Sequence, residues 1–175
     1  MTGFLRDATL SNGQTIRIRD IERDDRALVE EGFAHLSDRS RFMRFLAARN
    51  RLTEAELDTL TDPTDENDVA LGAIRPRKDG PPDPVGVARF IRLAPGSDSA
   101  ELALTVVDDF HGLGAGTHLM RALIDRARQC NVSRLIALVR RDNHAMRRLL
   151  AKFGGQKAPE DGPEIEIHLD VADSA

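Results

Sequence analysis

The sequence predicts a mixed domain of the α+β / α/β class, in which helices flank one central sheet. Three observations predict this class. Helix and strand patterns alternate along the chain, the run 135–139 (LIALV) is apolar throughout, and a strand, a helix and a second strand follow one another over 101–139. A continuous apolar run is typical of a strand buried on both faces, and the strand–helix–strand order predicts a right-handed βαβ unit. From the 175 residues we expect a single domain over 1–175, with a disordered tail after about residue 171.

The N-terminal half is expected to form a strand, three short helices and a hairpin. The stretch 15–19 alternates polar and apolar side chains, which predicts a strand. We expect Asp24 to cap the first helix, and Thr53 and Glu56 have the spacing of a capping box for the third. The other elements expected here are helices over 40–46 and 54–60, strands over 69–74 and 85–93 joined by a proline-rich loop at 75–84, and a strand over 101–107.

The C-terminal half has the more regular patterns. Apolar side chains recur at helical spacing over 115–130, and again from about residue 143 until Gly154 and Gly155 end the second helix. The single cysteine, Cys130, lies on the apolar face of the first of these helices, which indicates a core position. A buried strand over 134–139 separates the two helices, and an alternating strand over 164–171 closes the chain.

Composition argues against several functional classes. The 25 Lys and Arg residues against 29 Asp and Glu give a formal net charge of −4, which argues against a nucleic-acid partner. The chain has neither a long apolar run nor a basic segment followed by an apolar one at its start, so we expect no membrane partner, no signal peptide and a cytoplasmic location. His35, His118 and His168 lack the spacing of metal ligands, so no metal site is expected.

A glycine-rich loop that joins a predicted strand to the next helix is the strongest local signal. It contains Gly112, Gly114 and Gly116, followed by Thr117, and it lies in the segment 111–153, which carries nine basic and two acidic side chains. Glycines allow a tight turn in which several N–H groups converge, and a helix N-terminus attracts anions. The loop therefore predicts a phosphate-binding site; the alternative is a tight turn that only opens the helix.

Two other phosphate-binding motifs fit this loop less well. A P-loop requires Gly-Lys-Ser/Thr, and the loop has no lysine. The dinucleotide motif G-x-G-x-x-G requires glycine where Thr117 stands, and it begins in the tight turn directly after a strand. Too few residues follow Asp142 to complete a dinucleotide-binding fold. NADP is therefore the weaker alternative.

The stretch 109–116 (DFHGLGAG) resembles the Q/R-x-x-G-x-G/A acyl-CoA loop of the GNAT N-acetyltransferase superfamily. The order of the surrounding elements is similar to that family's over nearly the whole chain. More narrowly, residues 36–37 (LS), 41–46 (RFMRFL), 53–57 (TEAEL) and 100–103 (AELA) resemble the acetyltransferase domain of bacterial protein lysine acetyltransferases that act on acyl-CoA synthetases.

The resemblance implies a GNAT-like fold: a mixed, mostly antiparallel central sheet with a splayed pair of parallel strands and flanking helices. It also implies acetyl-CoA as co-substrate, with the pyrophosphate on the loop amides and the pantetheine arm along the strand before the loop. Two positions depart from the family pattern. His111 replaces the usual Gln or Arg, and either fills the loop or donates to a phosphate, while Gly155 replaces the usual Phe. The cofactor-binding residues implied are Val106, Val107, His111, Gly112, Leu113, Gly114, Ala115, Gly116, Thr117 and Asn143.

Acetyl transfer to an amine requires a base, because an ammonium group with a pKa near 10.4 is about 0.1% neutral or less at pH 7. Lysine acetyltransferases of this type carry a glutamate base at the start of the strand before the loop. The resemblance therefore implies Glu101 as the catalytic base, on one strand face with Ala103 and Thr105. The alternative is a carboxylate that is merely exposed at the strand edge. A backbone amide near Val107 is expected to hold the oxyanion.

Many family members protonate the departing thiolate with a tyrosine, and this chain has none. Leu150 occupies the corresponding position, so either the thiolate leaves unprotonated or another group such as His144 serves.

The implied function is N-acetylation of a primary amine, on a protein lysine or a small molecule. A non-catalytic CoA-binding regulatory module is the alternative. Arg41, Arg44 and Arg49 either meet an acidic acceptor or are only solvated. No pattern in the sequence indicates an oligomeric state.

Overall fold

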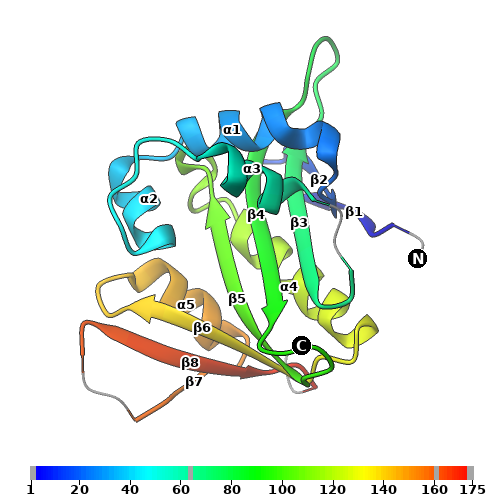
Figure 1. The fold of residues 1–175 in the computed structure, drawn as a ribbon. Helices are drawn as coiled ribbons and strands as arrows, with labels where there is room; N and C mark the ends of the chain where they lie inside the picture. Colours follow the sequence, from blue (N-terminus) through cyan, green and yellow to red (C-terminus); the bar gives the residue numbers. More distant parts are fainter. Residues whose placement is uncertain (1–2, 63–64, 160–161, 173–175) are drawn as a thin grey trace.

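Eight strands form one sheet in the order β1-β2-β3-β4-β5-β6-β8-β7 (Figure 1). The computed structural model describes residues 3–62, 65–159 and 162–172, so most of the tail expected to be disordered lies outside the described residues. The strands are β1 (Leu5–Thr9), β2 (Thr15–Asp20), β3 (Asp68–Arg75), β4 (Asp83–Arg92), β5 (Ser99–Val106), β6 (Arg134–Arg140), β7 (Gln156–Lys157) and β8 (Glu164–Asp170). The helices are α1 (Arg26–Ala34), α2 (Asp38–Phe45), α3 (Glu54–Thr61), α4 (Ala115–Gln129) and α5 (His144–Lys152), with 3₁₀ turns η1 (Arg23–Asp25) and η2 (Asp108–Phe110).

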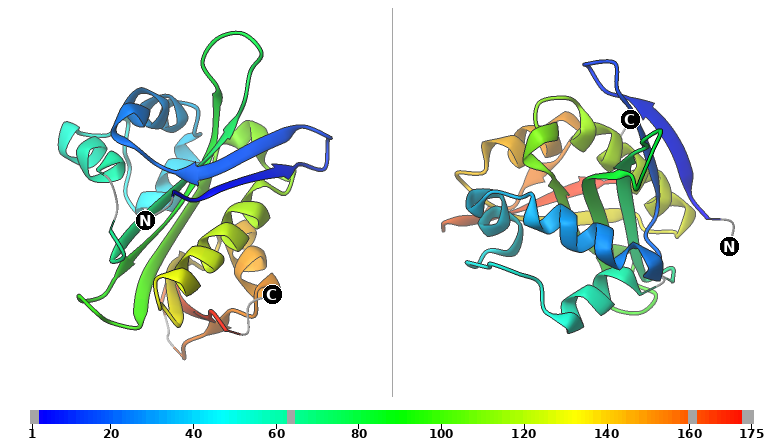
Figure 2. Two further views of the ribbon diagram at one scale, coloured as in Figure 1. Left: turned by 90° about the vertical axis from the view of Figure 1, so that its right-hand side faces the viewer. Right: turned by 90° about the horizontal axis from the view of Figure 1, so that it is seen from above.

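Helices cover both faces of the sheet. Figure 2 shows α1, α2 and α3 on one face and α4 and α5 on the other. α4 is the amphipathic helix predicted over 115–130, and it packs on β3, β4 and β5. Its buried side chains, including Leu119 and Leu123, join Phe90 of β4 in the main core, and Cys130 is buried as predicted. Neighbouring strands are antiparallel except β5 and β6, which confirms the mixed, mostly antiparallel sheet.

The parallel pair β5 and β6 separates after a short contact. Pairing extends only from Ser99 with Arg134 to Glu101 with Ile136. Beyond this point β5 continues to Val106 along β4, whereas β6 pairs with β8, and the two strands diverge in Figure 1. A gap therefore opens between β5 and β6, and the glycine loop follows β5 at the open end of that gap.

Some element boundaries differ from the prediction. Asp24 does not cap the first helix: it lies inside η1, and α1 begins after Asp25, whose carboxylate accepts two hydrogen bonds from Arg19 (2.6 Å each). α2 begins at residue 38, earlier than expected, because the Ser37 side chain caps it. The capping box of Thr53 and Glu56 at the start of α3 is confirmed.

Strands β1 and β7 are absent from the prediction. β1 lies at the edge of the sheet and pairs only with β2. Its one large apolar side chain, Leu5, is 65% exposed, so no apolar alternation marks the strand. β7 has only two residues, both exposed, and is defined by its pairing with β8. Tertiary pairing, which a local pattern does not show, creates both strands.

No helix among the described residues is long and apolar enough to span a lipid bilayer. In the same part of the chain, no group of three or more His, Cys, Asp or Glu side chains is arranged to hold a metal ion.

Candidate active site

The glycine loop between η2 and α4 turns through two left-handed residues. Gly112 and Gly114 have φ angles of 73° and 91°, which L side chains rarely adopt, and a Cβ at either position would project into open space. Gly116 differs from these two, because a Cβ there would make only ordinary van der Waals contacts, 3.4 Å from Leu149 of α5 and 3.6 Å from Val106 of β5. The backbone of the loop therefore requires glycine at positions 112 and 114, and the outer side of the loop is open there.

Consecutive backbone amides, those of residues 112–117, have no hydrogen-bond acceptor within the part of the chain that the structure describes. The next amide, that of His118, donates to the Gly114 carbonyl oxygen over 3.2 Å. Unpaired amides at the N-terminus of a helix, reinforced by the helix dipole, form a site for an anion. The loop therefore fits a pyrophosphate group, because a turn that only opens the helix does not need six consecutive unpaired amides.

His111 connects the loop to the strand before it. Its Nε2 lies 2.8 Å from the carbonyl oxygen of Val106, and because a carbonyl only accepts, Nε2 must carry the proton. Of the two roles expected for His111, this contact supports the one in which the side chain fills and braces the loop.

Asp108 connects the same region to α2. Its carboxylate accepts a hydrogen bond from the backbone amide of Ser37 over 3.1 Å. Burial acts to raise the pKa of Asp108, but hydrogen bonds from Ser37 and Ser40, together with nearby His111, outweigh burial and hold this pKa below its usual value. Asp108 is therefore a stable anion that fixes the start of α2 beside the loop.

The amides that face the gap differ from those expected. The amide of Val107 donates to the Val85 carbonyl oxygen over 2.9 Å, so it is bonded to β4 and is not available to hold an oxyanion or a pantetheine arm. Because successive amides of a strand point in opposite directions, the amides of Leu104 and Val106 face away from β4 and into the gap. The Val107 amide is therefore paired within the sheet, and Leu104 and Val106 are the residues whose amides face the gap.

The residues after β6 partly match the expectation. Asn143 caps α5, since its side-chain oxygen accepts the amide of Met146 over 3.1 Å. Leu150, at the position of the family's tyrosine, is fully buried in the core and supplies no proton donor. His144, the first residue of α5, is exposed.

Glu101 lies at the last residue pair between β5 and β6, where the gap begins. Its exposed side chain lines an open groove with Ala103, Ile91 and Leu93. Ala103 and Thr105 share its strand face as expected, but they are half-buried and Glu101 is not. Among the described residues, no hydrogen bond or ion pair involves the Glu101 carboxylate. At about 3.3 Å per residue, Glu101 stands roughly 16 Å along β5 from Val106 at the loop end.

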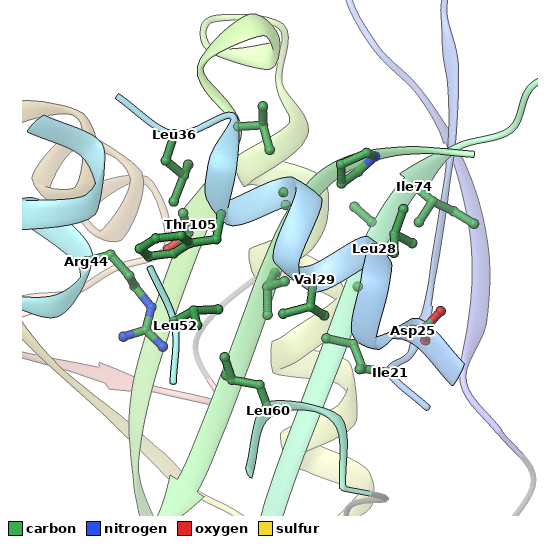
Figure 3. A pocket seen from close by; sticks show the side chains of 18 of the residues that line it. Ile21, Asp25, Leu28, Val29, Leu36, Arg44, Leu52, Leu60, Ile74 and Thr105 are labelled. Atoms are coloured by element: carbon green, nitrogen blue, oxygen red, sulfur yellow. The ribbon is translucent and has the colours of Figure 1, made fainter. Parts of the chain in front are cut away.

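An apolar pocket lies beside this groove on the same face of the sheet (Figure 3). Leu28, Val29 and Leu36 line it from α1 and the segment after it. Thr105 also lines the pocket, and its hydroxyl oxygen is buried without a hydrogen-bond partner in the described structure. Arg44 of α2 borders both the pocket and the groove. No local sequence pattern predicts the pocket, because the residues that line it come from elements far apart along the chain.

Comparison with known proteins shows one family. A family model described as an acetyltransferase (GNAT) domain matches residues 15–156. Acetyltransferase PA5475 of Pseudomonas aeruginosa is 32% identical over 162 residues, which cover 91% of this chain and 86% of that protein. Acetyltransferase Pat of Mycolicibacterium smegmatis is 32% identical over 160 residues, covering 91% of this chain and 46% of Pat. The chain thus spans about half the length of Pat.

A solved structure has the same fold. The GNAT domain of Streptomyces lividans PAT superposes with a TM-score of 0.86, and the match covers 95% of this chain and 96% of that one. The two sequences are 24% identical, so this likeness concerns the fold alone.

Proposed function

The chain belongs to the GNAT acetyltransferase family, and from this premise we propose that it acetylates the side-chain amine of a protein lysine. It is an acyl-CoA-dependent N-acetyltransferase with acetyl-CoA as its co-substrate. The groove at Glu101 is the observation that carries the choice of acceptor. Because the carboxylate is exposed beside Ile91 and Leu93, which are 45% and 58% exposed, a lysine on another protein's surface can reach it without entering a closed cavity. The resemblance of residues 41–46 and 100–103 to bacterial protein lysine acetyltransferases supports the same choice.

Acetyl-CoA, when bound, supplies the acetyl group as a reactive thioester. The amides of residues 112–117 would bind its pyrophosphate, and the amide of Val106 would orient its pantetheine arm in the gap. Asn143, beyond the open end of β6, would border the same arm. In this arrangement the phosphates would lie at the loop end of β5 and the thioester toward Glu101.

Glu101 would act as the general base. A lysine ammonium group must lose a proton before its nitrogen can attack, and the Glu101 carboxylate is a free acceptor at the rim of the gap. As the nitrogen attacks the thioester carbonyl, the amide of Leu104, the nearer to Glu101 of the two gap-facing amides, would donate to the oxygen on which negative charge develops. With Leu150 buried in the tyrosine position, the sulfur would leave as a thiolate, which is feasible at a thiol pKa near 8.5. As the C–S bond breaks, the nitrogen would release its second proton to water.

The apolar pocket supports a second candidate, a small amine with an apolar body. Its lining is largely aliphatic, and the unpartnered Thr105 hydroxyl offers one hydrogen bond to a ligand. A small acceptor could bury its apolar part there and present its amine to Glu101.

A panel of acceptors tests the proposal. Thiol release from acetyl-CoA is measured with lysine peptides, small amines and peptides whose lysine is dimethylated, and mass spectrometry locates the acetyl group. We expect release with lysine peptides, an acetyl group on Nε, and no release with the dimethylated control. Release with small amines alone would mean that the acceptor is a small amine bound in the apolar pocket. Binding of CoA without release for any acceptor would favour the regulatory module and refute both.

A further inference from the structure

Three guanidinium groups line the groove around Glu101, those of Arg44, Arg89 and Arg92. Two of them, those of Arg89 and Arg92, already donate hydrogen bonds to other groups of the protein. Arg89 is buried and donates to both oxygens of Asp68. Arg92 donates to three backbone carbonyl oxygens, those of Glu66, Ser97 and Cys130.

Arg44 differs from both. Among the described residues its guanidinium has no hydrogen bond or ion pair, and its Cζ lies 4.9 Å from the centroid of the Phe45 ring. Burial lowers the pKa of Arg44 to about 10, Arg89 acts in the same direction, and Glu101 opposes them. Arg44 therefore remains charged at pH 7, in a half-buried place where an unpaired charge is unfavourable.

Two other arginines of this segment, Arg41 and Arg49, have partners. Arg41 donates to the carbonyl oxygens of Phe33 and Ala34, at 3.3 and 3.0 Å. Arg49 stacks on the same Phe45 ring as Arg44, at 5.2 Å, but forms an ion pair with Glu56. Of the three arginines in the sequence that could meet an acidic acceptor, the structure therefore singles out Arg44.

We propose that Arg44 binds a carboxylate of the acceptor, so that the preferred acceptor is a lysine with an acidic residue beside it. This inference rests on the proposed lysine acetyltransferase function. The guanidinium can form a two-pronged pair with a carboxylate, and Arg44 borders the groove that holds Glu101. The groove also carries more positive than negative charge, which disfavours a lone lysine ammonium group and favours one that arrives with an anion.

Two labelled peptides test the inference by binding. They share one lysine, which is flanked by Asp on both sides in one peptide and by Asn in the other. Fluorescence anisotropy is measured with protein saturated in CoA, so binding is read without turnover. We expect the Asp peptide to bind at least about tenfold more tightly, as for a charge-assisted pair. Equal affinity for the two peptides would overturn the inference.

Variants identify the residue responsible. We expect Arg44→Gln to bring the two affinities to within about twofold of each other, and Arg44→Lys, which keeps the charge, to retain part of the preference. Arg49→Gln is the matched control, because it removes a second guanidinium from the same Phe45 ring, and it should leave the preference intact. An Arg44→Gln protein that still prefers the Asp peptide would contradict the assignment.

Acetyl transfer to the same peptides separates this inference from the proposed function. We expect kcat/KM to favour the Asp peptide, mostly through KM. A loss in Arg44→Gln that is equal for both peptides and confined to kcat would assign Arg44 to the reaction oxyanion and refute acceptor binding. If the Asp peptide binds selectively but is never acetylated, the lysine acetyltransferase function fails while the role of Arg44 stands.

Discussion

At the scale of single residues, Glu101 combines two features: its side chain borders the groove, and its carboxylate has no hydrogen-bond or ion-pair partner among the described residues. A free carboxylate can accept a proton from an incoming ammonium group. We expect Glu101→Gln to lower turnover by about 10²–10⁴ at pH 7 and to keep CoA binding, which involves the other end of β5.

The pH dependence of Glu101→Gln distinguishes the possible roles. The loss should shrink at pH 9, because more of the lysine amine, with a pKa near 10.4, is then already neutral. Turnover by both proteins is measured at pH 7 and pH 9 with one confirmed acceptor. A loss that is equal at the two pH values would assign Glu101 to acceptor binding, and a loss below tenfold at both would make it a strand-edge carboxylate.

Gly155 departs from the family's phenylalanine, and the structure explains the departure. A Cβ at this position would lie 2.9 Å from Ile167 Cγ2 of β8 and 2.9 Å from the Leu150 carbonyl oxygen, both closer than real Cβ contacts. We expect Gly155→Ala to destabilise the protein by about 1–3 kcal/mol through overpacking, without changing CoA affinity. Urea unfolding measures the change. A free energy of unfolding within about 0.5 kcal/mol of wild type would show that α5 and β8 adjust freely.

Only part of the proposed site could be predicted from the sequence, for a physical reason. Gly112, Gly114 and Asn143 act through the backbone next to them, so their roles leave a local pattern. The roles proposed for Arg44 and Thr105 depend on their tertiary neighbours. The Arg44 guanidinium has no partner among the described residues, whereas those of Arg41 and Arg49 do, and the Thr105 hydroxyl is buried without a hydrogen-bond partner. No local pattern contains that information.

At the scale of elements, the glycine loop acts as a unit with the first turn of α4. We expect Gly114→Asp to weaken CoA binding by tenfold or more, because a carboxylate then faces the phosphates beside the loop amides. Gly80→Asp is the matched control: Gly80 also has a positive φ, of 93°, and open space at its Cβ, but it lies in the loop between β3 and β4.

Calorimetry and thermal unfolding of both variants test the loop. The two substitutions should lower stability to a similar extent, because both force an L side chain into the left-handed region. Only Gly114→Asp should lower CoA affinity. Equal CoA affinity in the two folded variants would mean that the loop is a turn and not a phosphate site.

Elements with a strong local period were predictable, and those defined by pairing were not. α4 and β6 follow from apolar patterns that packing later satisfies. The prediction missed β1 because an edge strand needs no apolar face, and it misplaced the start of α1 because Asp25 rather than Asp24 pairs with Arg19. Such choices between adjacent residues depend on the tertiary partner.

At the scale of the whole molecule, the sheet decides between the two phosphate ligands that the glycine loop left open. A dinucleotide fold requires a parallel sheet on both sides of the strand before the loop. Here β5 is antiparallel to β4 and parallel to β6 over three residue pairs only. The gap that results accepts a linear arm between the strands, which suits CoA and not NADPH.

Ligand-dependent melting tests this whole-molecule argument. At a hundred times Kd, a ligand that binds only the folded state adds about 2.7 kcal/mol of stability, which corresponds to a rise in Tm of about 5–10 °C for a chain of this size. We expect CoA and acetyl-CoA to produce such a rise and NADPH, at the same concentration, to produce almost none. Gly114→Asp should reduce the CoA shift, which would tie the stabilisation to the loop. A larger shift with NADPH than with CoA would mean that the unpaired amides of residues 112–117 hold a dinucleotide despite the antiparallel neighbour of β5.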